Sequence, residues 1–326
     1  MKFLFLMAPL ETVVFEKDTT FMMMLGAHAR GHEVYFLPED GISLVEGKVY
    51  FHTTKVIPQP IAHLPFKEEH SARLSQDDIH AVFIRSDPPV DEQYLTNTWL
   101  LDHLPGHIAV INNPTGIRTV NEKVWVSQFK DLTPPTIISA NKGDLLDFIA
   151  KHKNIIAKPT NAFGGMSVFH IEKGNTNTKV ILETLTERYQ HAIVVQKYIP
   201  ESKNGDKRIL LLDGKILGAL LRMHADGEHR NNFFAGGKPM PTTINAQDKR
   251  IISILKPHLQ KLGLYFVGID ILGDYLIEVN VTSPTCLQET NRLYNVRLEE
   301  KIIDFVEKLT AKRLRLKPRH SKKSLQ

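Results

Sequence analysis

Short apolar runs alternate with a helix-like segment in the first 118 residues. The apolar runs are FLFLMA, HEVYFL, IHAVFIR and IAVINN, and residues 19–31 stand between the first two. In that segment Met22, Met23, Leu25 and Ala29 share a helical face, and Gly31 follows it as a C-cap. Strand–helix–strand spacing predicts a parallel sheet with right-handed crossovers. Residues 39–65 predict a hairpin and a loop inserted into this sheet.

The pattern changes after about residue 120. The prolines of DLTPPTIISA indicate a linker that enters a strand, and NIIAKP and IVVQKYI are strand-like runs. A glycine loop, NAFGGMSVFHI, and a predicted helix over 178–189 lie between these two runs. Two hairpins are then predicted, with turns at Asp213-Gly214 and Gly273-Asp274, and a last helix follows.

Composition and charge add limits to this picture. The chain has 326 residues, 42% hydrophobic content and 24% charged content, which is typical of a globular protein of two or three domains. Cys286 is the single cysteine, so an internal disulfide is excluded and a reducing, cytoplasmic location is expected. The opening MKFLFLMAPL is interrupted by Pro9 and Glu11, which favours a buried strand over a signal peptide. No apolar stretch reaches the roughly 20 residues of a spanning helix.

The net charge of +5 is concentrated at the end of the chain. The last fifteen residues hold seven basic side chains and no acidic one, so the rest of the chain carries about 5 − 7 = −2. A basic tail could contact nucleic acid or acidic lipid, but a solvated, disordered end is the simpler interpretation. We therefore expect neither a nucleic-acid nor a membrane partner.

Residues 154–165 carry the first candidate chemistry. Lys158 ends a predicted strand, and Gly164-Gly165 follow in a loop. Glycines let backbone N–H groups approach phosphate oxygens, and a lysine supplies a point charge. Taken alone, the same pattern also describes an ordinary turn.

The second predicted hairpin carries three oxygen ligands. Glu278 and Asn280 are two residues apart, so they leave the same face of a strand, and Asp270 lies across the turn. Such hard oxygen donors suit Mg²⁺ shared with nucleotide phosphates. Asp270 joins them only if the turn has an odd number of residues or a strand contains a bulge, because a one-residue slip changes the face.

A third group of residues lies between these two segments. The run QKYIP has an apolar and aromatic character that suits adenine, and GDKR with Arg222 supplies charges that suit phosphate or carboxylate. Residues 225–237 form a glycine-rich stretch typical of a lid. Each of these features could also be an ordinary surface element.

Taken in order along the chain, these segments resemble the ATP-grasp superfamily. Within it, KDTTFMMMLGAHARGHE, RSDPP, NEKVW, GDKRILLLDG, GLYFVGIDILGDYLIEVNVTSPT and the lid ending AGG are similar to bacterial glutathione synthetases. The resemblance covers about residues 1–310, and VNVTSPT and GDKR are its most specific parts.

The resemblance implies an α/β chain with the ATP-grasp fold. Residues 1–118 would form an N-terminal parallel-sheet domain that binds substrate, and 119–197 a small α+β lid domain. Residues 198–312 would form a C-terminal α+β domain with the metal site, and 313–326 a disordered basic tail. Family members are commonly homo-oligomers, often tetramers.

The resemblance also implies a role for each candidate residue. ATP would bind through Lys123, Lys158, Gly164, Gly165, Gln196, Lys197, Tyr198, Ile199 and Asp206. Two Mg²⁺ ions, replaceable by Mn²⁺, would be held by Asp270, Glu278 and Asn280. Arg208, Arg222 and Arg230 would be catalytic, with Arg230 in the lid. The expected reaction joins γ-glutamylcysteine to glycine through an acyl phosphate, with release of ADP and phosphate.

Several positions differ from the family pattern. The phosphate loop, often Asp-Gly-x-Gly-Gly, reads Asn161-Ala162-Phe163-Gly164-Gly165, and Lys238 stands where the lid usually ends in arginine. Ala8 replaces an aspartate and Ser86 replaces a lysine. Two alternatives therefore stay open: a related carboxylate–amine ligase with another acid or amine, and a nucleotide-binding relative without catalysis.

Overall fold

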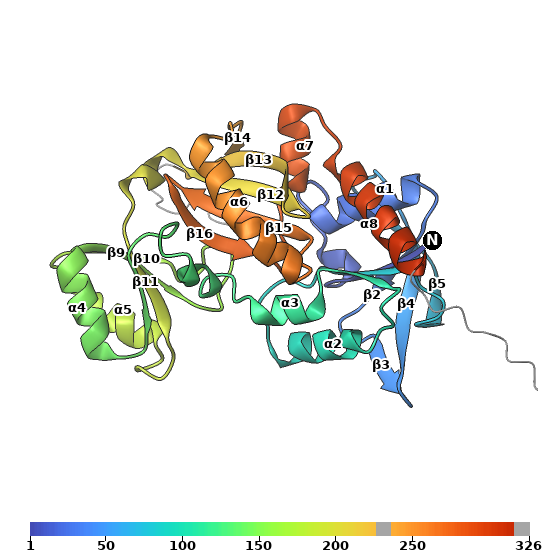
Figure 1. Cartoon of the computed structure of the whole chain (residues 1–326), viewed down its shortest axis with the longest axis horizontal. Helices are drawn as coiled ribbons and strands as arrows, with labels where there is room; N and C mark the ends of the chain where they lie inside the picture. The colour runs from blue at the N-terminus through green and yellow to red at the C-terminus, as the bar shows by residue number, and fades with distance from the viewer. Residues whose placement is uncertain (226–235, 316–326) are drawn as a thin grey trace, which may run out of the picture.

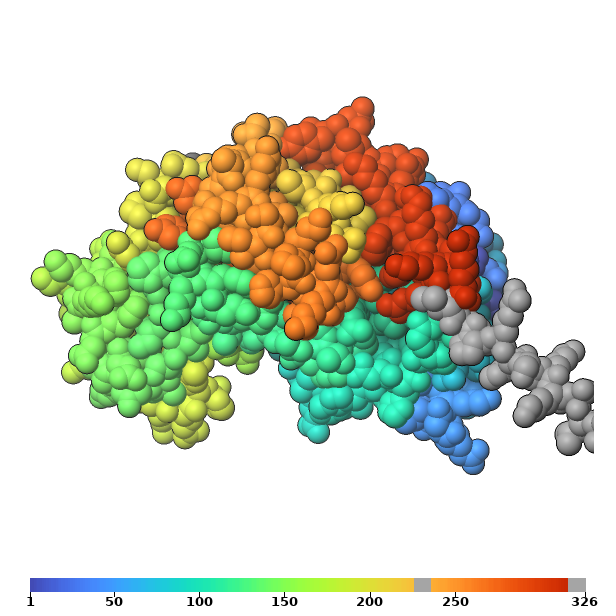
Figure 2. All heavy atoms as spheres, in the orientation of Figure 1, coloured from blue at the N-terminus to red at the C-terminus, as the bar shows by residue number. Residues whose placement is uncertain are grey.

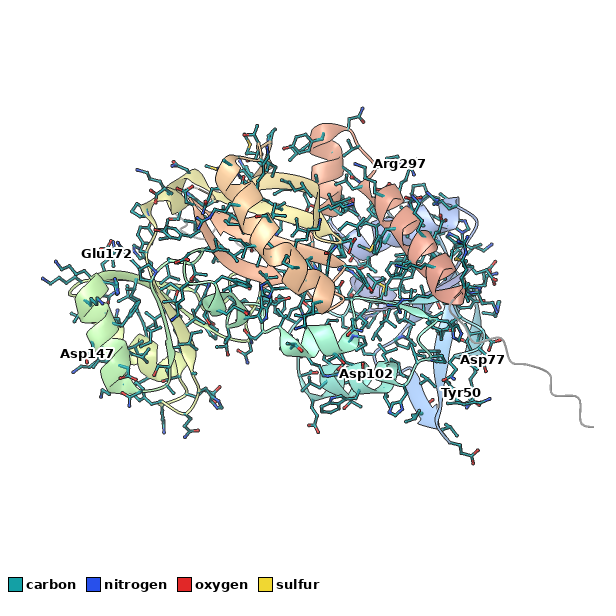
Figure 3. The ribbon with its side chains drawn as sticks, viewed as in Figure 1. Tyr50, Asp77, Asp102, Asp147, Glu172 and Arg297 are labelled. Carbon is teal, nitrogen blue, oxygen red and sulfur yellow. The ribbon has the colours of Figure 1, made fainter. Side chains whose placement is uncertain are left out.

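Three β-sheets organise the chain in the computed structural model, which describes residues 1–225 and 236–315. The sheet of the N-terminal part lies at one end of the molecule and the small sheet at the other, with the third sheet between them (Figure 1). Figure 2 shows the small-sheet lobe standing apart from the N-terminal part, with the surface hollowed between them. Asp147 and Glu172 mark the outer edge of that lobe, far from Tyr50 and Asp77 (Figure 3). In the described ranges no helix is long and apolar enough to cross a membrane.

The first sheet combines a parallel core with an antiparallel edge. Its strands are β1 (Lys2–Leu6), β2 (Glu33–Leu37), β3 (Ile42–Val45), β4 (Lys48–Pro58), β5 (Phe66–Ser75), β6 (Ala81–Ile84) and β7 (Ala109–Ile111). Strands β2, β1, β6 and β7 run parallel in that order, which confirms the predicted crossover sheet. The predicted insertion is longer than expected, because β5 pairs with β4 after the β3–β4 hairpin.

Helices pack on both faces of the first sheet. They are α1 (Thr19–Ala29), α2 (Glu92–Asp102), α3 (Pro114–Thr119) and, from the far end of the chain, α8 (Leu298–Arg315). The predicted face of α1 is partly wrong: Ala29 is exposed, whereas Phe21, Met24 and Ala27 are buried. The reason is that α1 packs against α8 as well as against the sheet, so it is covered on two sides.

The small sheet is antiparallel and has its own hydrophobic core. Its strands β8 (Thr136–Ser139), β9 (Asn154–Pro159), β10 (Phe169–Glu172) and β11 (Ile193–Lys197) have the order β10-β9-β11-β8. Helices α4 (Lys142–His152) and α5 (Thr178–Leu185) cover one face through Leu145 and Leu182. The helix predicted over 178–189 ends four residues early, because residues 187–189 have positive φ angles.

The third sheet contains both predicted hairpins. Its strands β12 (Asp206–Leu212), β13 (Lys215–Met223), β14 (Lys238–Met240), β15 (Phe266–Leu272) and β16 (Tyr275–Asn280) have the order β14-β13-β12-β15-β16. Asp213 and Gly214 have φ angles of 51° and 68°, as a two-residue hairpin turn requires. Helix α6 (Ala246–Lys261) packs on this sheet, and α7 (Leu287–Tyr294) follows it.

The first and third sheets are joined by a buried amide. Asn112 Nδ2 donates to the carbonyls of Phe266 and Val281, each at 2.8 Å, and Asn112 Oδ1 accepts from Phe266 N at 2.8 Å. Two hydrophobic clusters also contain residues from both sheets. The first and third sheets therefore form one packed unit.

The end of α8 corrects the predicted start of the tail. The helix continues to Arg315, and Arg313 donates to Ile108 O at 2.6 Å and to Tyr265 Oη at 3.2 Å. Residues 313–315 are therefore part of the packed helix, held by hydrogen bonds that cross to the first and third sheets. Residues 316–326 lie outside the described residues.

Candidate active site

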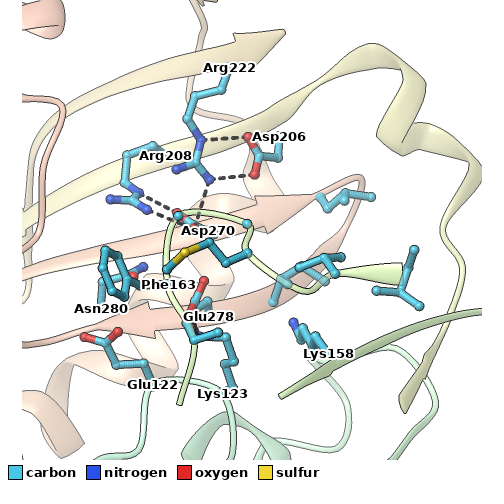
Figure 4. Close-up of a pocket in the computed structure, with 18 of the residues that line it drawn as sticks. Glu122, Lys123, Lys158, Phe163, Asp206, Arg208, Arg222, Asp270, Glu278 and Asn280 are labelled. Carbon is cyan, nitrogen blue, oxygen red and sulfur yellow. Dashed lines mark hydrogen bonds and ion pairs between the residues drawn. The ribbon is translucent and has the colours of Figure 1, made fainter. Parts of the chain in front are cut away.

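One pocket collects residues from the small sheet, from the third sheet and from segments of the N-terminal part outside its strands (Figure 4). Its walls come from β9, β11, the glycine loop, β12, β13, β15 and β16, with Lys17 and Asp87 contributed by the N-terminal part. The sequence-predicted residues in its lining are Lys123, Lys158, Gly164, Gly165, Gln196, Lys197, Tyr198, Ile199, Asp206, Arg208, Arg222, Asp270, Glu278 and Asn280. Segments more than 150 residues apart in the sequence thus meet at one site.

Asp270 and Glu278 face each other because of a bulge. The turn between β15 and β16 has two residues, Gly273 and Asp274, which alone would put the two carboxylates on opposite faces. A register shift after Asp270 adds one residue to β16, so Asp270 pairs with Glu278 and Gly268 with Asn280. Of the two conditions set by the sequence, the bulge is the one that the fold meets.

Two arginines and two aspartates form a buried network at the upper wall. Arg208 Nε donates to Asp270 Oδ1 at 2.5 Å, and Arg208 Nη2 donates to Asp270 Oδ2 at 3.0 Å. Arg222 binds both oxygens of Asp206, at 2.8 and 2.6 Å, and also reaches Asp270 Oδ2 at 2.9 Å. Burial alone would raise the pKa of Asp270, but the two guanidinium groups hold this pKa well below its usual range.

Successive side chains of β12 point to opposite faces of the sheet, and this alternation decides which of them join the network. Asp206 and Arg208 face the pocket, whereas Lys207 points to the other face, where its Nζ lies 2.5 Å from Asp248 Oδ2 on α6. The lysine of the GDKR segment is therefore part of a structural ion pair outside the pocket.

The two candidate phosphate lysines have different surroundings. Lys123 Nζ lies 2.6 Å from Glu278 Oε1 and donates to Ala162 O at 2.5 Å. Burial opposes its charge, but Glu278 outweighs burial and the pKa of Lys123 is raised. Burial lowers the pKa of Lys158 to about 8, with Glu278 opposing the shift and Lys123 adding to it.

The glycine loop lines the pocket and contacts Lys123 through the carbonyl of Ala162. Gly164 and Gly165 have φ angles of 62° and 80°, a conformation that other residues rarely adopt. Phe163 lines the pocket beside them at the variable position of the family pattern, and Ala162 stands where that pattern has glycine. The two glycines thus supply the sharp backbone path, and Phe163 adds an aromatic side to the loop.

The strand β11 and the residues after it form the apolar wall. Tyr198 stacks on His170 with ring centroids 4.3 Å apart and an interplanar angle of 25°. Ile199 is buried, and Gln196 donates to Thr136 Oγ1 at 3.0 Å, which fixes its amide. A flat aromatic or heteroaromatic ring suits such a wall.

Besides Asp87, two acidic residues line the pocket that were missed in the sequence. Glu122 Oε1 accepts from Val281 N at 2.8 Å and from Thr282 N at 3.1 Å. Burial, and next the nearby Glu278, raise the pKa of Glu122. Glu289 lies in the first turn of α7 and is 5% exposed, and its Oε2 atom has no hydrogen-bond partner among the described residues. The only sequence signal was the position of Glu122 inside the quoted NEKVW segment.

The predicted metal ligands fit a hard divalent cation. Asn280 Nδ2 donates to Gly268 O at 3.2 Å, which leaves the amide oxygen as the donor for an ion. The described chain holds no group of three or more His, Cys, Asp and Glu side chains placed for a metal, so the set consists of two carboxylates and one amide. Mg²⁺ suits such a small set because it keeps waters and takes phosphate oxygens as further ligands.

Arg230, the third predicted catalytic arginine, lies outside the described residues, since 226–235 are not described. Lys238, at the end of the predicted lid, is exposed on β14 and pairs in register with Met223. The lid assignment of Arg230 therefore stays a prediction.

Comparison with known proteins agrees with this architecture. The sequence profile of the prokaryotic glutathione synthetase N-terminal domain matches residues 1–118, and that of the ATP-grasp domain of the same family matches residues 122–295. A D-cycloserine synthetase, DcsG, has a similar structure, with a TM-score of 0.66 at 13% identity over 94% of this chain and 99% of that one. The macrocyclase MdnC of Microcystis aeruginosa has a TM-score of 0.64 at 16% identity over 94% of this chain and 100% of that one.

Similarity in sequence extends over nearly the whole chain. A glutathione synthetase of Synechocystis sp. is 39% identical over 318 residues, which cover 94% of this chain and 99% of that protein. The glutathione synthetase of Vibrio cholerae is 37% identical over 93% of this chain and 96% of its own length. With both domain profiles matched and such coverage by relatives, the chain belongs to the prokaryotic glutathione synthetase family, and its fold is the ATP-grasp fold.

Proposed function

We propose that this enzyme uses the pocket to join γ-glutamylcysteine to glycine at the expense of ATP, giving glutathione, ADP and phosphate. The observation that carries the proposal is the meeting of lysines, arginines and metal-type oxygen donors in one cavity with an apolar wall. These are the groups that a phosphoryl transfer to a carboxylate requires.

The chemistry follows from the low reactivity of a carboxylate. In the first step the peptide carboxylate attacks the γ-phosphorus of ATP, so that an acyl phosphate forms and ADP leaves. In the second step the glycine amine attacks the acyl carbon, phosphate leaves and the amine loses a proton. We assign Lys123 and Lys158 to the phosphates, and Arg208 and Arg222 to the negative charge that develops on the acyl group. Holding both reactants in place supplies much of the remaining acceleration.

The metal and nucleotide assignments complete this proposal. Asp270, Glu278 and Asn280 would hold two Mg²⁺ ions, or Mn²⁺, and bound Mg²⁺ would neutralise charge on the transferred phosphoryl group. Adenine would lie against Gln196, Lys197, Tyr198 and Ile199, with Asp206, Gly164 and Gly165 also on the nucleotide side. Arg230 would come from the lid, which keeps water from the acyl phosphate.

The wider organisation is part of the same proposal. We assign residues 1–118 to substrate binding, 119–197 to the lid domain and 198 to the end of α8 to the C-terminal domain. A cytoplasmic location is supported by the single, buried cysteine, since a reducing compartment suits a free thiol. A homo-oligomer, often a tetramer in this family, is expected.

A related ligase with another acid or amine is the second candidate. Its supporting observation is Ser86, which is 2% exposed and whose Oγ has no hydrogen-bond partner among the described residues, at a position where the family pattern has lysine. A relative without catalysis is less consistent with the pocket, because binding alone does not need two carboxylates and an amide beside two lysines.

The reaction is tested by mass spectrometry and phosphate release. Purified protein is incubated with Mg-ATP, γ-glutamylcysteine and glycine, and each component is omitted in turn. Glutathione in equal amount to phosphate, formed only in the complete mixture, is the expected result. ATP binding without product would move the assignment to another acid–amine pair, which a substrate screen would identify.

Glu278→Gln tests the metal assignment. The amide removes one charge from the cation site and from the partner of Lys123 Nζ, so phosphate release should fall by at least about 100-fold while the fold is kept. Glu172→Gln, an exposed change at the outer edge of the small sheet, is the control and should leave turnover unchanged. Turnover of Glu278→Gln equal to the wild type would exclude Glu278 as a metal ligand.

A further inference from the structure

Glu122 occupies an unusual position between two parts of the pocket. It lies between α3 and the 3₁₀ turn at Trp125–Gln128, in the segment that leads from the first sheet toward the small sheet. It directly precedes Lys123, and both side chains line the pocket. Its contacts, however, are made with the third sheet.

These contacts surround Asn280 on both sides. The backbone carbonyl of Glu122 accepts from Val279 N at 3.0 Å, on the residue before Asn280. Its Oε1 atom accepts from Val281 N at 2.8 Å, on the residue after, and from Thr282 N at 3.1 Å and Thr282 Oγ1 at 2.9 Å. One residue therefore fixes the backbone on either side of a candidate metal ligand, at the point where β16 ends.

The same contacts hold Lys123 against the third sheet and not with the small sheet. Lys158 is carried by β9 of the small sheet, whose core is separate. Lys123 follows Glu122 and is therefore held against the third sheet, where its Nζ lies 2.6 Å from Glu278 Oε1. The hydrogen bond from Lys123 Nζ to Ala162 O, at 2.5 Å, then connects the third sheet to the glycine loop of the small sheet.

We propose that Glu122 is a positioning residue that sets Asn280 and Lys123 in one fixed arrangement with Glu278, so that metal and phosphates are bound together. The inference rests on the proposed function only in naming these ligands as Mg²⁺ and ATP. The proposed role depends on Oε1 of Glu122 as an acceptor, because this atom receives all three hydrogen bonds made to the side chain. Residues that orient metal ligands through hydrogen bonds commonly affect metal affinity strongly.

The variants Glu122→Ala and Glu122→Gln separate geometry from charge. The alanine removes all three acceptor contacts, whereas the glutamine keeps an oxygen that accepts them and removes only the negative charge. The readout is Mn²⁺ binding followed by electron paramagnetic resonance in the presence of a non-hydrolysable ATP analogue. Glu122→Ala should weaken Mn²⁺ binding about 10- to 100-fold, and Glu122→Gln should bind nearly as the wild type does.

Glu299→Ala is the matched control. Glu299 is also a buried glutamate that accepts hydrogen bonds, from Asn291 Nδ2 at 2.6 Å and Arg297 Nε at 3.2 Å, but it lies on α8 outside the pocket. It should lose stability without losing Mn²⁺ affinity. In steady-state assays, added Mg²⁺ should restore part of the turnover of Glu122→Ala and none of any loss in Glu299→Ala.

The proposal is overturned if Glu122→Gln binds Mn²⁺ as weakly as Glu122→Ala does, because the negative charge of Glu122 would then itself contribute to metal binding. It is also overturned if Glu122→Ala binds Mn²⁺ as the wild type does. Should Glu122→Ala fail to fold, Thr282→Val decides: it removes one donor to Oε1 and should weaken Mn²⁺ binding measurably, whereas unchanged binding contradicts the proposal. No acid or amine substrate is used, so failure of the glutathione assay and failure of this test are distinct results.

Discussion

The two candidate phosphate lysines are chemically different because of their neighbours. Lys123 contacts Glu278 directly, and this carboxylate keeps its ammonium charged. Lys158 is affected most by burial, which lowers its pKa to about 8. Phosphate oxygens would restore the preference of Lys158 for its charged form, so nucleotide binding and proton uptake should be linked.

The affinity for ADP, as for ATP, should therefore depend on pH through Lys158. Below pH 8 the lysine is already charged in the free protein, and affinity is at its full value. Above pH 8 each binding event must take up a proton, so affinity should fall by up to about tenfold per pH unit until the raised pKa of the complex is reached. Calorimetric titration of ADP at pH 7 to 9.5, in two buffers of different ionisation enthalpy, measures both effects. Lys158→Met should bind more weakly with a flat profile, and a flat wild-type profile would contradict the assignment.

The two positions at which the chain lacks a family charge lie just beyond the ends of two paired strands, β1 and β6. Leu6 of β1 and Ile84 of β6 are paired in register, and Ala8 and Ser86 each follow two residues later. The family pattern has an aspartate and a lysine at these neighbouring positions. We predict that the two family charges form an opposite pair, so that their joint loss leaves neither charge unpaired.

A double-mutant cycle tests this pairing. Ser86→Lys alone should lower the free energy of unfolding by about 3 kcal/mol or more, because it buries an unpaired charge. Ala8→Asp with Ser86→Lys should recover part of that loss, with a coupling energy of about 1 kcal/mol or more. Denaturant unfolding of the four proteins gives the coupling, and additive effects would show that the two positions do not interact.

At the scale of elements, turns and buried strands were predictable because local chemistry determines them. The Asp213-Gly214 turn follows from a need for positive φ angles, and the parallel strands follow from continuous apolar runs. The buried face of α1 was not predictable, since a single stripe was assumed and α8 covers a second side. The strand β5 was missed because its sequence is largely polar, and pairing with β4 holds it in place.

The candidate site, like the elements, could be predicted only where local sequence determines it. The lysines, arginines and metal-type residues were recognisable because they lie in segments with a family pattern. The bulge of β16 could only be stated as a condition, because sequence spacing does not show which residue is left out of the ladder. Glu122 was missed because its contacts are with residues about 160 positions later, and no local pattern indicates them.

The packing of α1 on α8 can be tested at Gly26. A Cβ atom at Gly26 would lie 3.0 Å from Cγ of Glu299 and 3.5 Å from Cγ1 of Ile303, so the two helices are in close contact where α1 lacks a side chain. Gly26→Val should lower the free energy of unfolding by about 1–3 kcal/mol, with kcat per folded molecule unchanged. Gly106→Val has no atom within 4 Å of the new Cβ and should be close to neutral. Equal melting temperatures for the two variants would contradict this packing.

At the scale of the whole molecule, α8 ties the end of the chain to its beginning. His32 Nε2 lies 2.7 Å from Glu307 Oε1, and Arg30 Nε donates to the same oxygen at 2.9 Å. Near the end of α8, Arg313 contacts the backbone just before β7 and the hydroxyl of Tyr265. The first and third sheets are thus held in one unit by a helix that does not line the pocket.

Two truncations separate the helix from the basic residues beyond it. Ending the chain after Arg315 keeps both hydrogen bonds of Arg313, and the melting temperature should not change. Ending it after Lys312 removes them and should lower the free energy of unfolding by about 1–2 kcal/mol. Arg313→Ala in the full chain should show the same loss, because the arginine and not the length of the chain is responsible. Arg313 does not line the pocket, so kcat per folded molecule should be equal in all three proteins. A large loss of activity on ending the chain after Arg315 would instead give the basic residues a functional role.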